Sequence, residues 1–391
     1  MNIFPKIEKV AKNVTFVHLP LMFSYKLFSL YFPLYLLEKN FSLVQVGYTN
    51  FLIYLPIALF SPIAGYLNHK INPAILASLG VLGYGLYSLG MIFFPNLFVF
   101  YLLQIILGIS AALFFVSSRA IMMGSNLKNP DKAFAFFYSV PSYADALAPA
   151  IGALLIWKFG FIGVFAASVV FQILTSMYCF FSLRKDSEKL TEDIEVHESV
   201  KNYSKIFKTM KLKGTLPLII TSFLVLIISG FNNTFFVLFL KNINWSQNQI
   251  LIFSSLISIV YLPLSYLVIK IIKKKSVSNI SYGSQIVGIF SIILGASVSF
   301  LNFYLAFIIM LGKNVGGLIA NSGRSGLLTT KLKKYPEESA AIDTIFSPLS
   351  TAFGALIGGL IIGPLGYPLI FATSGVLIFT CGLLSKKSSI S

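Results

Sequence analysis

Three ionisable residues, Lys26, Asp145 and Lys313, interrupt otherwise apolar stretches of this sequence. A charge at the centre of a membrane-spanning helix costs about 2.5–3.5 kcal/mol on insertion scales, so each one needs a compensating partner or a water-filled cavity. The two ammonium groups can donate to an anionic or zwitterionic solute, while Asp145 pairs with one of them or carries a proton. The alternative is structural: Asp145 forms a permanent ion pair that closes two helical bundles on one face, and the lysines only tie helices together.

These residues lie within twelve apolar stretches that follow one another between Val14 and Ser385. Each stretch is roughly 20–25 residues long, which is enough for a helix to cross a bilayer. The composition agrees, because 56% of the 391 residues are hydrophobic and only 11% are charged. We therefore expect an all-α polytopic membrane protein with twelve transmembrane helices. The expected spans are roughly 14–37, 43–67, 73–94, 97–120, 133–157, 160–183, 215–240, 247–272, 277–299, 301–327, 339–363 and 366–385.

The basic residues are distributed unevenly between the two sides of this arrangement. Of the 30 Lys and Arg residues, 25 fall on the side of the N-terminus, and Lys39, Lys158 and Lys241 fall on the other. Basic loops stay in the cytoplasm, so we expect both termini and the long central loop to be cytoplasmic, in a plasma membrane. The net charge of +17 then reflects membrane topology, and we expect no nucleic-acid partner.

A segment of mixed charge, residues 184–214, divides the chain into two blocks of six spans. Its low apolar content is typical of a linker that carries at most one surface helix. We expect an N-terminal six-helix bundle over 1–183, a cytoplasmic linker over 184–214 and a C-terminal six-helix bundle over 215–391.

The two blocks resemble each other at an offset of about 206 residues. Small residues occupy the same places in ADALAPAIGA and STAFGALIGG, and Gly152, Gly354 and Gly358 in these stretches would let helices approach closely. The stretches SSRA and SGRS place Arg119 and Arg324 at corresponding helix ends. Repeated halves indicate a pseudo-two-fold molecule.

With six spans, a long loop and six further spans, the whole chain resembles the major facilitator superfamily of secondary transporters. In that family the loop between helices two and three carries G-x-x-x-D-R-x-G-R-R; here Gly65 and Lys70 match, while His69 replaces the acid. Helix five of the antiporter branch carries G-x-x-x-G-P-x-x-G-G, and this chain keeps Pro149 and Gly152 of that pattern.

The resemblance implies two bundles that rock about a central cavity lined by spans one, four, seven and ten. It would place Lys26, Gln104, Asn232, Asn233 and Lys313 around that cavity. Gln104 stands where many proton-coupled members carry an arginine, which weakens a borrowed coupling mechanism. Gln104 and the two asparagines can equally bond to a neighbouring helix.

The remaining charged residues have more than one interpretation. Arg119 and Arg324 either snorkel to the interface or take part in gating. Asp343 begins span eleven, where it caps the helix or meets a basic loop, and we expect no role for it in transport. We predict no metal site and no cofactor, since the three histidines are expected to be packed or solvated: His18, His69 and His197.

The resemblance implies a secondary active transporter of a small organic solute that works by alternating access and is coupled to protons, with export favoured over uptake. The alternatives are a symporter or facilitator that imports an organic acid, amino acid or sugar, and a membrane protein that binds or assembles without transporting. No G-x-x-x-x-G-K-[ST] loop or catalytic constellation is present in the sequence, so we expect no enzyme. The expected partners are the solute, protons and the lipid bilayer, and we expect a monomer.

Overall fold

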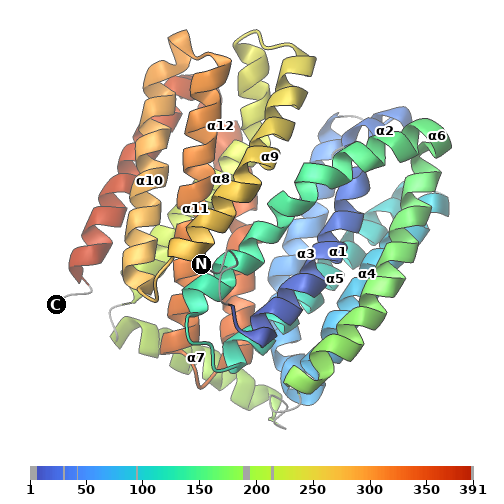
Figure 1. Cartoon of the computed structure of the whole chain (residues 1–391), viewed down its shortest axis with the longest axis vertical. Coiled ribbons are helices and arrows are strands. Elements are labelled where there is room, and N and C mark those ends of the chain that lie inside the picture. The colour runs from blue at the N-terminus through green and yellow to red at the C-terminus, as the bar shows by residue number, and fades with distance from the viewer. Residues whose placement is uncertain are drawn as a thin grey trace, which may run out of the picture.

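The computed structural model describes residues 7–29, 31–41, 43–93, 96–187, 194–212 and 215–388. These residues are almost entirely helical (Figure 1). The elements are α1 (Lys9–Ser29), α2 (Phe32–Glu38), α3 (Leu43–Lys70), α4 (Pro73–Phe93), α5 (Leu97–Gly124), α6 (Pro130–Ser187), α7 (Val196–Leu212), α8 (Leu216–Asn242), α9 (Gln247–Ile271), α10 (Ser276–Ser297), the 3-10 turn η1 (Val298–Phe300), α11 (Phe303–Lys331) and α12 (Pro336–Ser388).

Two of these helices, α6 and α12, are each divided into two arms by a glycine. Gly160 has a φ of 66° and Gly366 a φ of 70°. This left-handed region is open to glycine and costly for residues with a Cβ atom, so the chain turns here without a long loop. The breaks fall where the sequence predicts the ends of spans five and eleven.

Eight of the described helices are long and apolar enough to cross a membrane, or nine if the bent pair of α7 and α8 counts as one span. The other predicted spans correspond to α1 with α2, α8, one arm of α6 and one arm of α12. The predicted all-helical membrane architecture is therefore confirmed. Several boundaries differ by a few residues: α1 begins at Lys9, before the predicted start at residue 14, and α6 continues to Ser187, past the predicted end of span six at residue 183. Its last residues are polar and can extend as helix beyond the apolar layer.

The helices form two groups that lie side by side, α1–α6 in one and α8–α12 in the other (Figure 1). Helix α7 crosses one end of both groups, and we call this end the α7 face. The described chain begins in α1 and ends in α12 towards this face. The loops between α3 and α4, α5 and α6, α9 and α10, and α11 and α12 also lie there.

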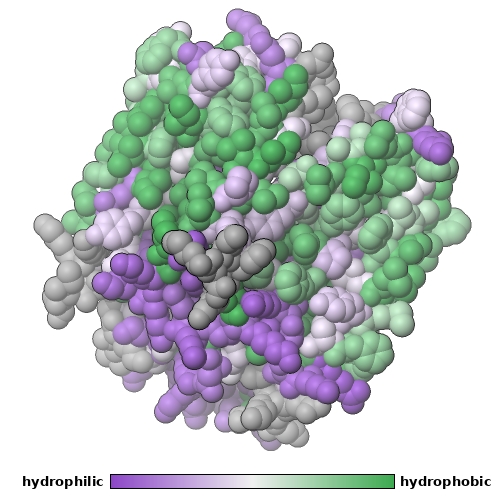
Figure 2. All heavy atoms as spheres, viewed as in Figure 1, coloured by the Kyte–Doolittle hydropathy of each residue, from purple (hydrophilic) through white to green (hydrophobic). Residues whose placement is uncertain are grey.

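The surface of the molecule is divided by polarity. Figure 2 shows hydrophobic residues over the flanks of both groups and hydrophilic residues gathered at the α7 face. Large apolar side chains such as Leu59, Phe93 and Trp157 are more than half exposed. So wide an apolar surface would be unfavourable in water, and it suits the hydrocarbon layer of a bilayer.

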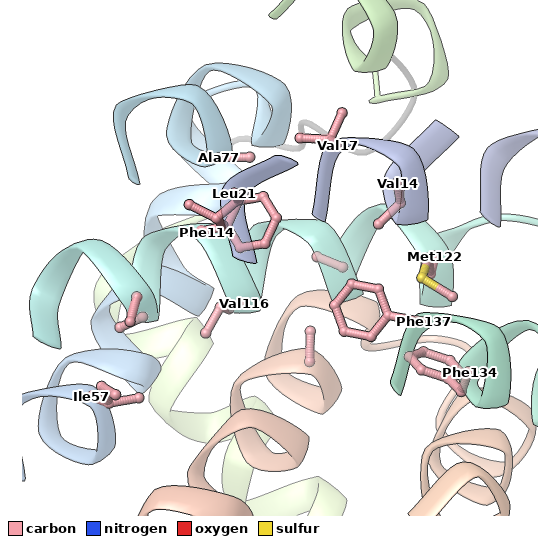
Figure 3. Packing of buried hydrophobic residues seen from close by; sticks show 14 of the residues in the cluster. Val14, Val17, Leu21, Ile57, Ala77, Phe114, Val116, Met122, Phe134 and Phe137 are labelled. Carbon is pink, nitrogen blue, oxygen red and sulfur yellow. The ribbon is translucent and has the colours of Figure 1, made fainter. Parts of the chain in front are cut away.

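The core of the first group is packed by side chains from α1, α5 and α6. Val14 and Leu21 of α1 lie beside Phe114 of α5 and Phe137 of α6 (Figure 3). Near the C-terminal end of α1, a Cβ atom on Gly152 would meet the backbone of Leu27. The small residue therefore permits the close approach of α1 and α6 that its position predicts.

Candidate functional site

A cavity of about 360 Å³ lies between the two groups, where α6, α8, α9, α10 and α11 meet. Asp145 and Lys313 both line it, each near the middle of its helical arm. The other polar residues of the lining are Tyr138, Ser142, Ser229, Ser258, Tyr261, Asn314 and Asn321. The arrangement offers donors and acceptors at the depth where the bilayer supplies none.

Lys313 is buried in this wall, and no carboxylate of the described residues forms an ion pair with it. Lys313 is 5% exposed, and its Nζ atom has no hydrogen-bond partner among the described residues. The ammonium lies 5.4 Å from the centroid of the Phe371 ring, a contact that stabilises a cation only in part. A buried ammonium in this state favours any ligand that brings an acceptor.

Lys26 is paired differently, although it too was expected to face the cavity. Its Nζ lies 2.9 Å from Oδ1 and 3.1 Å from Oδ2 of Asp145, and the two side chains are 25% and 33% exposed. The predicted pairing of Asp145 with one lysine is therefore present. Both residues belong to the first group, so this pair ties α1 to α6 and does not join the two bundles. Lys26 is not among the described residues that line the cavity, whereas its partner Asp145 is.

Of the predicted amides, Gln104 lies outside the described lining of the cavity. Gln104 is fully buried in α5, where Nε2 lies 3.5 Å from the Tyr87 hydroxyl and 3.5 Å from the Phe100 carbonyl oxygen. The contact with Tyr87 of α4 is a bond to a neighbouring helix, which is the alternative that the sequence left open for Gln104. Asn232 and Asn233 lie in α8, and their side chains are outside the described part of the structure.

The contact that joins the two groups below the cavity is centred on Asp343. Its Oδ1 lies 2.8 Å from Arg324 Nε, and its Oδ2 lies 3.4 Å from Arg119 Nε. Oδ2 also accepts hydrogen bonds from Tyr138 at 2.8 Å and from Ser325 at 2.7 Å. We call these five residues the Asp343 cluster. Because Tyr138 also lines the cavity, the cluster forms its floor towards the α7 face.

The structure differs from two expectations about the residues of the Asp343 cluster. Arg119 and Arg324 do not snorkel, since both are buried and share one carboxylate. Asp343 does more than cap a helix, because it comes from the second group and binds Arg119 of the first. The signal that could have found it is the pair of arginines in the repeated stretches, which need a carboxylate wherever they are buried.

Two further contacts join the groups at the α7 face. Asp131 of α6 accepts from Ser276 at 2.7 Å and from Asn279 at 2.5 Å. His69 of α3 lies 3.2 Å from a carboxylate oxygen of Glu338 and 3.9 Å from one of Glu337. Together with the Asp343 cluster, these contacts join the two groups at the α7 face.

Residues of the degenerate loop motif lie beside the His69 contact. A Cβ atom on Gly65 would lie 3.1 Å from Ala341 Cβ, so the glycine lets α3 approach α12 closely. Lys70 is exposed at the end of α3. Tyr203 of α7 donates to the Pro62 carbonyl oxygen at 3.4 Å, and burial raises the pKa of its phenol, which keeps the donor protonated. The linker helix is thus attached to the first group.

The remaining packing residues lie at helix contacts within each group. The carbonyl oxygen of Pro149 accepts from the Tyr31 hydroxyl at 3.0 Å. Cβ atoms on Gly354 and Gly358 would meet α8, the first at the backbone of Ile227 and the second at the Phe231 ring. The first arm of α12 therefore packs on α8 as the first arm of α6 packs on α1.

Residues 14–342 match the sequence family described as the Major Facilitator Superfamily, whereas no curated protein matches the chain. Among solved structures, the human organic anion transporter MFSD10 (TETRAN) is 14% identical with a TM-score of 0.70, over 96% of this chain and 99% of that chain. A bacterial homologue of the iron transporter ferroportin in an outward-facing state is 14% identical with a TM-score of 0.72, over 97% and 98%. The proton:xylose symporter XylE is 13% identical with a TM-score of 0.72, over 97% and 95%. At these identities the likeness shows a shared fold.

Proposed function

Because this chain belongs to the major facilitator superfamily, we propose that it is a secondary active transporter that moves a small organic anion or zwitterion across the plasma membrane. We infer the chemical class of the solute from Lys313. Its buried ammonium lines the central cavity and has no hydrogen-bond partner in the described chain. A carboxylate or phosphate group on the solute would supply that acceptor in a charge-assisted hydrogen bond. The cavity volume of about 360 Å³ suits a small molecule.

The transport cycle that we propose is alternating access between two domains, residues 1–183 and 215–391, joined by the linker 184–214. The basic α7 face is the cytoplasmic side in this proposal, since basic loops stay in the cytoplasm. The contacts of Asp343, Asp131 and His69 would then close the cavity to the cytoplasm. Opening of that side requires these contacts to break while others form at the opposite end.

We further propose that transport is coupled to protons and that the protein exports its solute. Asp145 is an acid that faces the cavity and binds Lys26, so protonation of its carboxylate would release the lysine. The carboxylate therefore links a proton to the charge balance of the cavity. Export is favoured because the helix with Pro149 and Gly152 resembles that of the antiporter branch.

The proposal is tested with sealed proteoliposomes that contain a trapped pH dye and are challenged with separate pools of anionic, zwitterionic, cationic and neutral solutes. We expect a proton flux with the anionic or zwitterionic pool, and Lys313→Ala should reduce it at least about tenfold, which corresponds to ~1.4 kcal/mol of lost binding. Lys158→Ala is the matched control, because Lys158 is exposed and outside the cavity lining. A flux with cations alone, or full activity in Lys313→Ala, would contradict the solute class.

A further inference from the structure

Three side chains that can bind metals meet where α3 and α12 touch at the α7 face. The ligand atoms of His69, Glu337 and Glu338 all lie within 4.8 Å of one another. His69 Nε2 lies 3.2 Å from Glu338 Oε1 and 3.9 Å from Glu337 Oε2. All three residues are buried. The sequence predicts no such cluster, since His69 and Glu338 are 269 residues apart in the chain.

Glu338 is the member of the cluster whose contacts are incomplete. Its Oε1 accepts a hydrogen bond from Asn202 of α7 at 3.1 Å and also contacts His69. Its Oε2 is buried and has no hydrogen-bond partner among the described residues. An unsatisfied buried acceptor destabilises the folded state, and more so when it is charged. A bound cation would remove this destabilisation.

We propose that His69, Glu337 and Glu338 bind a divalent transition-metal ion that holds the α7 face closed. One imidazole nitrogen and two carboxylate oxygens are ligands of Zn²⁺, which binds them at roughly 2.0–2.2 Å. Ligands at that distance in a tetrahedral site are about 3.3–3.6 Å apart. The two separations of 3.2 and 3.9 Å are close to this geometry, and every pair of ligand atoms lies within 4.8 Å.

A pocket of about 440 Å³ beside the cluster provides an access route and room for a water molecule as fourth ligand. His69, Glu337 and Asn202 line it, and so do Lys205 and Lys333. Mg²⁺ prefers oxygen ligands in a near-octahedral arrangement, which one imidazole and two carboxylates do not supply. The imidazole favours an ion of the zinc class. The site should therefore prefer Zn²⁺ to Mg²⁺.

This role rests on the alternating access proposed above: the ion would join elements that separate when the α7 face opens. His69 belongs to α3 in the first group, while Glu337 and Glu338 belong to α12 in the second. Asn202 adds the linker helix through its bond to Glu338. The metal thus acts as a regulator of opening that is separate from the solute in the central cavity.

The test is a titration of the purified, tag-free full chain with Co²⁺, whose visible absorption reports coordination in a zinc site. We expect one saturable site per chain, displacement of Co²⁺ by Zn²⁺, and a rise in apparent unfolding temperature with Zn²⁺ but not with equal Mg²⁺. His69→Gln and Glu338→Gln should each weaken binding at least about tenfold. His197→Gln is the control, because His197 is an exposed histidine on α7.

The proposal is overturned if the wild-type chain shows no saturable Co²⁺ spectrum. It is also overturned if His69→Gln retains the spectrum at wild-type affinity. His69→Gln carries the decision even if Glu338→Gln fails to fold, because the glutamine keeps a polar group beside both glutamates. Binding is read from absorption and unfolding, so the outcome does not depend on finding the transported solute.

Discussion

Lys313 and Lys26 differ in how the protein satisfies a lysine charge in the middle of the membrane. Lys26 is bound by both oxygens of Asp145. Lys313 has only the face of the Phe371 ring in the described structure. The unmatched lysine is therefore the one that can gain most from an anionic solute, while the matched pair can exchange its partner only after a proton or solute intervenes.

The role of Asp145 can be separated from that of a structural ion pair. An amide cannot take up and release a proton, so Asp145→Asn should lose gradient-driven transport by about tenfold or more and keep solute exchange. Both modes are measured in the same proteoliposomes with and without a proton gradient. A purely structural pair would instead lower yield and stability, so equal loss of both modes with a lower unfolding temperature would exclude the proton role.

Loss of the Asp343 carboxylate is expected to destabilise the folded protein. Asp343→Asn leaves Arg119 and Arg324 buried without their carboxylate, and removal of one partner from a buried ion pair costs about 3–5 kcal/mol. The unfolding temperature in detergent should fall clearly relative to Glu195→Gln, which changes an exposed residue beside α7. An unchanged unfolding temperature would show that the arginines are satisfied by other groups.

At the scale of the helices, glycines in the two repeated stretches permit close helix contacts in both groups. Gly152 lets the first arm of α6 lie against the backbone of α1, and Gly354 lets the first arm of α12 lie against α8. In each case the obstacle to a larger side chain is backbone, which cannot rotate away as a side chain can. The distance between the helices therefore depends on these glycines.

Gly152→Ala should accordingly destabilise the protein although it adds only one methyl group. The new Cβ would meet the Leu27 carbonyl oxygen, so α1 and α6 must move apart, at a cost of about 1–3 kcal/mol. Gly363→Ala is the matched control in α12, since no described atom beyond its chain neighbours and its own helix backbone lies within 4 Å of the place that its methyl group would take. Thermal unfolding of the two variants in the same detergent checks the difference, and equal stability would contradict the packing argument.

The helices could be predicted from the sequence because hydropathy is a local property, and the breaks at Gly160 and Gly366 coincide with the predicted starts of spans six and twelve. Lys313 could be found in the same way, as a charge within an apolar stretch. The partners of Asp343 could not, because Tyr138 lies 205 residues away and meets it only after both groups have packed. The contact of His69 with Glu338 was missed for the same reason.

At the scale of the whole molecule, the repeat is visible in corresponding contacts. Asn96 caps α5 and Asn302 caps α11 with the same side-chain bond, about 206 residues apart, which is the offset of the two repeated blocks. Asp131 at the start of α6 contacts the start of α10, and Glu337 at the start of α12 contacts the end of α3. The two groups are thus joined at the α7 face by a related pair of contacts on either side of the Asp343 cluster.

If transport requires these contacts to separate, a covalent bond across them should stop it. Asp131→Cys with Ser276→Cys places two thiols across the groups, where the native atoms are 2.7 Å apart. Oxidation should abolish transport and reduction should restore it, because a disulfide cannot yield to the rocking of the two groups. Ser88→Cys with Ser168→Cys is the control within the first group, where the hydroxyls are 3.1 Å apart. Oxidation of the control should leave transport intact, and undiminished transport in the fully cross-linked first variant would mean that the α7 face does not open during the cycle.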